Sequence, residues 1–468
     1  MPPAPKASIL GWEDDPGEPG TARHPSARPR PALSSAPLPV SIAGKAPPAR
    51  EFKIGSAEFR YWAAADALGR AAQFWGTIVP KGTRWHSTNG TRMPVQLDED
   101  VDLNAYYDRH GLHFFHDTVR GLTVYSGESP DVLCHELGHA VLDGLRPQLW
   151  DAMSGEIAAF HESFGDMSAM LSALQLRSLR EEVLAETASR PERSSRLSRL
   201  AEQLGWAVRQ GHPDAVDRDC LRNASNSFFY TDPIKLPPTA PATMLSSEPH
   251  SFSRVFTGAF LDLLAGMFRL QKKRDQTGLL DAARDAATIL VTATKASPVV
   301  PAYFSQIAAH MIAIDASDFG GRYRDALKSG FVRHGVLSLQ AATSPPQLAR
   351  DVEDGPLARI ALPAAHLGLP QELVVTTASH PKRFAVTGSD ADVGVTESPG
   401  HDDAAASFLE DLVRRGEVDF NDHAVADAAV LAPRRRKTHE VVRERELLVL
   451  VRRCIDCVLC GGGATLSR

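Results

Sequence analysis

The residues best suited to do chemistry lie in the run His135-Glu136-Leu137-Gly138-His139. The run lies within an apolar segment, Val132 to Leu145, whose spacing predicts a helix. Residues four positions apart share one face of a helix, so His135 and His139 can hold a single ion between their imidazoles. Zinc binds neutral imidazole at about 2.0–2.1 Å and suits such a pair. Glu136 is then placed to act as the general base toward a zinc-activated water.

A zinc site built on two imidazoles needs a third protein ligand and an open position for water. Glu162, which follows His139 by 23 residues, is the candidate, and the adjacent His161 is the competing donor. Asp166 lies one helical turn after Glu162, where it can accept the free ring N–H of a zinc-bound histidine. The helix around these acids is apolar, and buried carboxylates require partners. The sequence therefore predicts a Zn2+ site of His135, His139 and Glu162, supported by Asp166.

These motifs resemble the gluzincin metallopeptidases, and more narrowly the thermolysin-like neutral metallopeptidase family. Other segments resemble that family in the same order, over roughly residues 55–340. Asn104-Ala105, 31 residues before His135 and followed by two tyrosines, resembles the edge strand that binds the substrate backbone. Leu221-Arg222-Asn223 resembles the segment whose arginine binds a substrate carbonyl. His250 resembles the histidine that stabilises the oxyanion.

The chain also departs from the family pattern. Trp150 stands where the family has an active-site tyrosine, and its indole N–H can only donate. The aspartate that orients the family's oxyanion histidine is not at the matching place, and whether Glu248 replaces it stays open. Most calcium-ligand positions are not recognisable; Asp131 matches one but is explained as a first-turn helix residue. The family's signal peptide and folding propeptide are not evident.

Apolar spacing and breaker residues predict an α+β protein. The predicted parts are a disordered Pro-rich arm (1–50), an N-terminal α+β lobe with the zinc helix (51–155), a helical lobe (156–340) and a small α+β C-terminal appendage (341–468). The arm holds 12 of the 33 prolines and few aromatic residues. In the appendage we expect strands at Ala358–Leu362, Leu373–Thr377, Phe384–Val386 and Leu447–Arg453, and a helix at Asp402–Gly416. The resemblance implies a two-lobed thermolysin-like core with the zinc helix at the base of the cleft.

Composition limits the classes of partner. The chain has 468 residues, is 43% hydrophobic and 23% charged, and carries a net charge of −6, which does not favour nucleic acid as a partner. No apolar run reaches the roughly 18 residues of a membrane span. Residues 1–50 lack a signal-peptide pattern, so a cytoplasmic location is the default expectation, and export by another route stays open. A monomer acting on a peptide or protein substrate is expected.

The resulting functional prediction is a zinc metalloendopeptidase. The alternative is a zinc-bound but catalytically weak module that binds a peptide or protein, which Trp150 and the missing orienting aspartate favour. A zinc aminopeptidase would need a group that captures the substrate's free amine, and no such motif is found. Three of the five cysteines, Cys454, Cys457 and Cys460, could hold a metal, but no fourth ligand is evident nearby. Reduced thiols in a mobile tail are the simpler interpretation.

Overall fold

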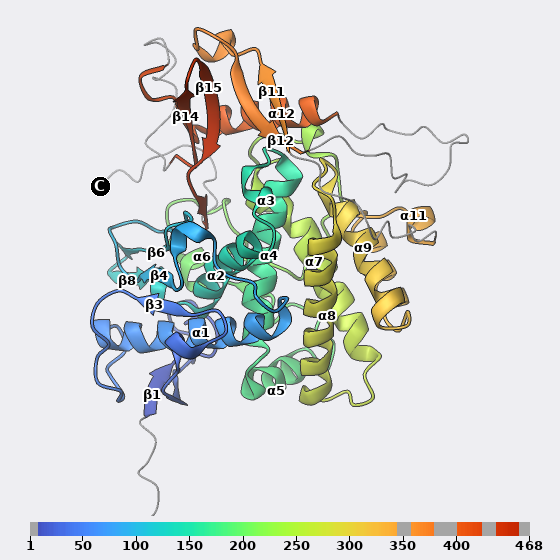
Figure 1. Cartoon of the computed structure of the whole chain (residues 1–468). Coiled ribbons are helices and arrows are strands. Elements are labelled where there is room, and N and C mark those ends of the chain that lie inside the picture. The colour runs from blue at the N-terminus through green and yellow to red at the C-terminus, as the bar shows by residue number, and fades with distance from the viewer. Residues whose placement is uncertain (1–7, 344–356, 379–399, 424–436, 458–468) are drawn as a thin grey trace, which may run out of the picture.

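The structure of the chain is a computed structural model that describes residues 8–343, 357–378, 400–423 and 437–457. It mixes helices and sheets, which confirms the α+β class. A small sheet and one long helix form the N-terminal part, a group of helices follows, and a separate sheet stands above them (Figure 1).

The N-terminal sheet carries strands from both ends of the chain. Its order is β16-β5-β6-β4-β3. Strand β3 pairs in parallel with β4 and β4 with β6, whereas β5 is antiparallel to both β6 and β16. A two-stranded ribbon of β7 and β8 follows β6. The strands are β3 (Val40–Ile42), β4 (Met93–Gln96), β5 (Ala105–Tyr107), β6 (Leu112–Phe114), β7 (His116–Val119), β8 (Leu122–Tyr125) and β16 (Ile455–Asp456).

The helices lie close to their expected places. The predicted helix from Glu58 to about Val79 is α1 (Ala57–Ile78), and the helix expected to carry the metal motif is α2 (Pro130–Leu145). None of the helices that the structure describes is both long and apolar enough to cross a membrane. The remaining helices before the appendage are α3 (Gln148–Asp151), α4 (Gly155–Ala173), α5 (Arg177–Glu186), α6 (Glu202–Arg209), α7 (Pro249–Arg269), α8 (Gln276–Ala296), α9 (Tyr303–Asp318), α10 (Arg324–Arg333) and α11 (Leu339–Thr343).

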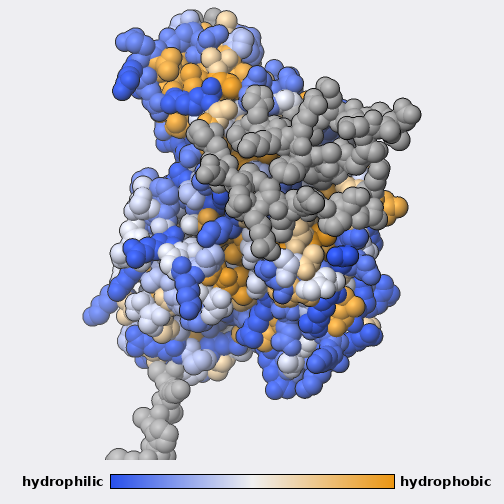
Figure 2. Space-filling view, turned by 45° about the vertical axis from the view of Figure 1, so that its right-hand side comes forward, coloured by the Kyte–Doolittle hydropathy of each residue, from blue (hydrophilic) through white to orange (hydrophobic). Residues whose placement is uncertain are grey.

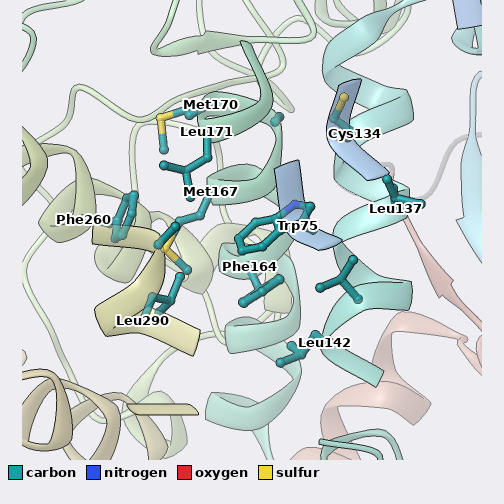
Figure 3. Close-up of a cluster of buried hydrophobic side chains, with 14 of the residues drawn as sticks. Trp75, Cys134, Leu137, Leu142, Phe164, Met167, Met170, Leu171, Phe260 and Leu290 are labelled. Atoms are coloured by element: carbon teal, nitrogen blue, oxygen red, sulfur yellow. The ribbon is translucent and has the colours of Figure 1, made fainter. Parts of the chain in front are cut away.

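Trp75 joins the three helices that surround the metal motif. It reaches from α1 into the space between α2 and α4, where Figure 3 shows it beside Phe164 and near Leu137. Its ring stacks on Phe164 with the centroids 5.2 Å apart. Its indole N–H donates to Ser168 Oγ at 2.9 Å, and Ser168 Oγ donates to the Cys134 carbonyl at 2.7 Å. The buried indole thus satisfies its N–H while it fixes α4 against α2.

The C-terminal appendage has its own sheet and its own hydrophobic core. The sheet order is β11-β12-β15-β14-β13, and side chains of α12 pack in the same core. Met153 and Ala158 belong to that core too, so the appendage sits on the beginning of α4 (Figure 1). Its exposed surface mixes hydrophilic and hydrophobic side chains (Figure 2). The elements are β11 (Ala358–Leu362), β12 (Leu373–Thr377), α12 (His401–Arg415), β13 (Val418–Asp419), β14 (His439–Glu444) and β15 (Leu447–Arg452). The strand expected at Phe384–Val386 lies outside the described residues.

The prediction of a disordered N-terminal arm is wrong for residues 8–50. Strands β1 (Ser8–Gly11) and β2 (Ser26–Pro29) pair with each other, and β3 extends the N-terminal sheet. Ile9, Trp12, Leu38, Val40 and Ile42 are all at most 7% exposed. Proline is unfavourable inside helices and in the central strands of sheets. It is compatible with an extended chain that packs on the surface of a folded core. A few well-spaced apolar side chains are enough to hold such a chain.

Charged groups of the arm also reach the start of the zinc helix. Asp15 accepts hydrogen bonds from Ser129 Oγ at 2.6 Å and from the Gln203 N–H at 2.8 Å. Arg23 pairs with Glu202 at 2.6 Å. Asp131 accepts from the Ala201 N–H at 3.0 Å, in keeping with a first-turn helix residue that binds its neighbours. The arm therefore supports the end of α2 that leads into the metal motif.

Replacement of Trp12 by alanine tests this packing. Trp12 is 7% exposed and contacts Phe59 edge to face, with ring centroids 6.0 Å apart. Loss of a buried tryptophan should lower the free energy of unfolding by about 3–5 kcal/mol. Phe229→Ala, at a residue that is 60% exposed, is the control and should change it by less than about 1 kcal/mol. Denaturant unfolding that gives equal shifts for both variants would show that the arm does not stabilise the core.

Candidate metal centre

Helix α2, which carries the candidate metal motif, begins as its sequence predicts. Ser129 is the N-cap and its side chain accepts from the Val132 N–H at 3.4 Å, while Pro130 occupies the first turn. The helix is buried from Pro130 through Asp143. It therefore presents its two histidines to the interior and not to solvent.

The side chains of His135, His139 and Glu162 converge. The two imidazole Nε2 atoms lie 3.0 Å apart. Glu162 places Oε2 at 3.3 Å from His135 Nε2 and Oε1 at 3.8 Å from His139 Nε2. Ligands of a tetrahedral zinc ion with bonds of about 2.0–2.1 Å lie about 3.3–3.4 Å apart. The donor atoms are thus of the right kind and spacing to fit a zinc ion.

Glu136 also comes close to this group. Donor atoms of His135, Glu136 and His139 all lie within 4.8 Å of one another, so these three buried residues alone could hold a metal ion. We prefer Glu162 as the third ligand because its oxygens face both Nε2 atoms. Neither carboxylate oxygen of Glu136 has a hydrogen-bond partner among the described residues. Burial raises the pKa of Glu136 to about 8.

Asp166 supports His135 as predicted. The His135 Nδ1–H donates to Asp166 Oδ1 at 3.1 Å, which leaves Nε2 free for a metal. Arg222 donates to the same oxygen at 2.9 Å. Burial alone would raise the pKa of Asp166, but the Arg222 guanidinium and the bond from His135 outweigh it and lower the pKa to about 2. Arg222 therefore has a structural partner as well as the substrate role that the resemblance implies.

The structure supplies a partner for His250 that the sequence left open. His250 Nδ1 donates to Glu248 Oε1 at 2.6 Å, and Glu248 Oε2 accepts from the Ser251 N–H at 2.9 Å as the N-cap of α7. Burial alone would raise the pKa of Glu248, but His250 outweighs it and the pKa falls to about 2. His250 Nε2 lies 3.1 Å from Glu162 Oε2. Glu248 thus fixes the ring so that Nε2 faces the candidate ligand Glu162.

Trp150 and His161, which the sequence placed near the metal site, have different surroundings in the structure. Trp150 lies against Tyr107, with ring centroids 5.5 Å apart, and near the guanidinium of Arg109. Among the contacts of the described residues, none joins Trp150 to the three candidate ligands. His161, the competing donor, is fully buried, and neither of its ring nitrogens has a hydrogen-bond partner in the described part of the chain. Its ring centroid is 5.9 Å from that of His139.

The predicted substrate strand is already paired. Asn104 and Ala105 are buried, and Asn104 Oδ1 accepts from the Ala105 N–H at 2.9 Å. Strand β16 runs antiparallel along β5, and the Ala105 carbonyl accepts from the Cys457 N–H at 2.9 Å. Cys454 and Cys457 pack in different hydrophobic clusters, and the described residues do not bring them into a group of three potential metal ligands. Cys460 lies outside the described residues.

Gly165 is a site residue that the motif analysis missed. A Cβ at Gly165 would lie 2.6 Å from His135 Cε1 and Nδ1, so only glycine leaves room for that ring. Gly138 on α2 is similarly close to α4, where a Cβ would lie 2.7 Å from Ser168 Cβ. A glycine directly before Asp166 in an apolar helix was the available signal, because glycine costs helix stability unless close packing requires it.

We therefore expect Gly165→Ala to weaken zinc binding. The added methyl group must displace the His135 ring, and we expect a loss of at least about 10-fold in affinity, as for other disturbed ligand supports. Gly155→Ala is the matched control in the same helix, because its Cβ would meet Pro233 at an ordinary 3.7 Å. Competition with a chelator measures both affinities. Equal zinc affinity in the two variants would show that the His135 ring is not held where the structure places it.

The chemistry that this centre can do follows from its own side chains. A scan against models of protein families finds no match for the chain, and a search of curated proteins finds none either. Two imidazoles and one carboxylate leave a fourth position around a zinc ion for water or substrate. Glu136, whose carboxyl group has no hydrogen-bond partner in the described part of the chain, and the oriented imidazole of His250 adjoin the three candidate ligands. This set of groups is suited to metal-assisted hydrolysis.

Proposed function

We propose that this protein is a zinc-dependent metallopeptidase that hydrolyses internal peptide bonds. The observation that carries the proposal is the buried convergence of His135, His139 and Glu162 beside Glu136, whose carboxylate oxygens lack hydrogen-bond partners among the described residues. A fully buried carboxyl group without a hydrogen-bond partner among the described residues is costly, so its presence in a well-packed core favours a function.

The roles of the side chains follow from their positions. Zinc held by His135, His139 and Glu162 would supply a nucleophilic water near neutral pH and polarise the scissile carbonyl. Glu136 accepts a proton at its carboxylate and delivers it to the leaving amine. His250 donates from Nε2 to the carbonyl oxygen of the bond under attack. The Glu248 carboxylate, which accepts from Nδ1, favours the imidazolium form that carries a proton on both ring nitrogens.

The architecture is compatible with the thermolysin-like family that the motifs resemble. We propose two lobes, one built from the N-terminal sheet with α1 and α2, and one from α4 and the helices that follow. Residues 104–105 and Arg222 would bind the backbone of a peptide that crosses α2. Glu248 at His250 takes the place of the family's orienting aspartate, which removes one objection to activity.

The alternative is a zinc-bound module that binds a peptide without cleaving it. Its support is Trp150, whose described contacts do not reach the three candidate ligands, so that one donor to the developing oxyanion is missing. A single oxyanion donor is worth about 10²–10³ in rate, so the lost donor would slow catalysis without preventing it.

A digest of a mixed peptide pool distinguishes the two functions. The zinc-loaded protein should generate new internal peptide termini, detected by mass spectrometry, and a chelator should stop their formation until zinc is restored. New termini that persist in the chelated protein would contradict a metal-dependent mechanism. Peptides that are retained on the zinc-loaded protein without any new termini would support the binding module instead.

A further inference from the structure

Three of the groups expected to contact a substrate, Ala105, Arg222 and His250, bind one segment of this chain. The Ala105 carbonyl accepts from the Cys457 N–H at 2.9 Å. His250 Nε2 donates to the Asp456 carbonyl at 2.7 Å. Arg222 Nη1 donates to the Cys457 carbonyl at 3.3 Å. The strand, the histidine and the arginine thus contact two consecutive residues near the C-terminus in the manner expected of a peptide substrate.

The register of these contacts identifies the peptide bond that faces the centre. The expected oxyanion donor, His250, binds the carbonyl of Asp456, and the next N–H along the chain is bound by the edge strand. The bond between Asp456 and Cys457 therefore takes the position of a scissile bond. Strand β16 supplies the antiparallel pairing that an extended peptide would make with an exposed sheet edge.

We propose that residues 454–457 are an internal blocking segment that occupies the substrate site of the metal centre. The identification of these residues as a substrate site rests on the proposed function. Their contacts with residues 454–457 do not depend on it. The segment is well held: Ile455 is 4% exposed, Cys457 is 1% exposed, and both belong to the main hydrophobic core. Cys454 packs with Tyr106 and Phe115 on the other side of the strand.

Burial of the centre agrees with a blocked site. The side chains needed for catalysis are at most 3% exposed, so a peptide cannot reach them while the segment is bound. The residues concerned are His135, Glu136, His139, Glu162, Asp166, Arg222 and His250.

The appendage explains how the segment is kept in place. Strand β15 ends at Arg452, only three residues before β16 begins, and Figure 1 shows the dark red chain passing from β15 down toward α2. The appendage itself is fixed to the core, where Arg452 Nε donates to the Trp150 carbonyl at 3.0 Å and the Met153 N–H donates to the Thr376 carbonyl at 2.9 Å. A short tether of this kind gives an effective concentration on the order of millimolar, which a free peptide must exceed to compete.

The test uses three variants of the full, zinc-loaded chain. Ile455→Asp places a charge in the core and should release the segment, whereas Ile455→Val keeps the position apolar and should not. Cys457→Pro gives a second route to release, because proline lacks the N–H that Ala105 accepts. A tripeptide hydroxamate, which coordinates zinc through its terminal group, serves as the probe of access. Hydrogen exchange at residues 105–107 reports the pairing of β5 independently of any activity.

Release should raise the affinity of the hydroxamate at least about 10-fold in Ile455→Asp and in Cys457→Pro, with faster exchange at residues 105–107. Ile455→Val should match the parent in both measurements. Added in trans, a peptide of residues 452–457 should compete with the probe on the released chain. The inference is overturned if exchange at β5 rises while the affinity of the probe stays at the parent value. If the probe binds more tightly but no peptide is cleaved, the blocking segment stands and the peptidase proposal fails.

Discussion

Glu136→Gln should retain zinc and the fold but lose at least about 10²-fold in peptide cleavage. The amide has the size of the carboxylate but cannot accept a proton, so the substitution removes the general base and little else. Glu136 is fully buried, and its oxygens have no hydrogen-bond partner in the described part of the chain, so no structural bond is lost. The comparison is best made in the Ile455→Asp background, where a peptide can reach the site.

Glu156→Gln is the matched control for this substitution. Glu156 is also a buried glutamate, and it accepts a hydrogen bond from the Phe304 N–H at 2.9 Å, away from the metal motif. Its amide can still accept from that N–H, so cleavage should stay within about threefold of the background chain, which corresponds to less than about 1 kcal/mol. If Glu136→Gln cleaves peptides as fast as the background chain, the hydrolytic mechanism proposed here is wrong.

His139→Ala should abolish tight zinc binding. Removal of one of three protein ligands leaves two donors, and structural and catalytic zinc sites hold the ion with three or four. Metal analysis of the purified protein should give about one zinc per chain in the parent and almost none in the variant. Because metal binding contributes free energy only to the folded state, the melting temperature of the variant should also stop responding to added zinc.

His161→Ala is the control, because His161 is equally buried and lies beside Glu162 on α4. Zinc content should be unchanged in this variant. Loss of zinc from His161→Ala but not from His139→Ala would exchange the roles of the two histidines. A parent content clearly above one zinc per chain would indicate a second site at the C-terminal cysteines, which Cys457→Ser should then remove.

Local patterns in the sequence were enough to predict the helices and to bring the candidate ligands together. Apolar spacing placed α1 and α2 to within about two residues of their observed bounds, because each helix carries its own cap and its own buried face. The spacing from His139 to Glu162 likewise indicated that the two residues would lie close together, and the packing of α2 against α4 places Glu162 Oε1 at 3.8 Å from His139 Nε2. Asp166 contacts His135 as expected.

Long-range pairings could not be predicted in this way. The pairing of β16 with β5 joins residues about 350 positions apart, and β16 itself is only two residues long. The packing of the N-terminal arm was missed for a related reason. Its few apolar side chains are buried only by contact with residues far away in the sequence, so local composition does not reveal it. Glu248 stayed open because its contact with His250 depends on the cap geometry of α7.

X-ray absorption at the zinc edge tests the central claim most directly. The account predicts one zinc per chain surrounded only by nitrogen and oxygen neighbours at about 2.0–2.2 Å, with two imidazoles among them, in the chain released by Ile455→Asp. Glu162→Ala should lower the occupancy of that site. A spectrum dominated by sulfur neighbours at about 2.3 Å, or a protein that binds no zinc at all, would contradict the site of His135, His139 and Glu162 and with it the proposed peptidase.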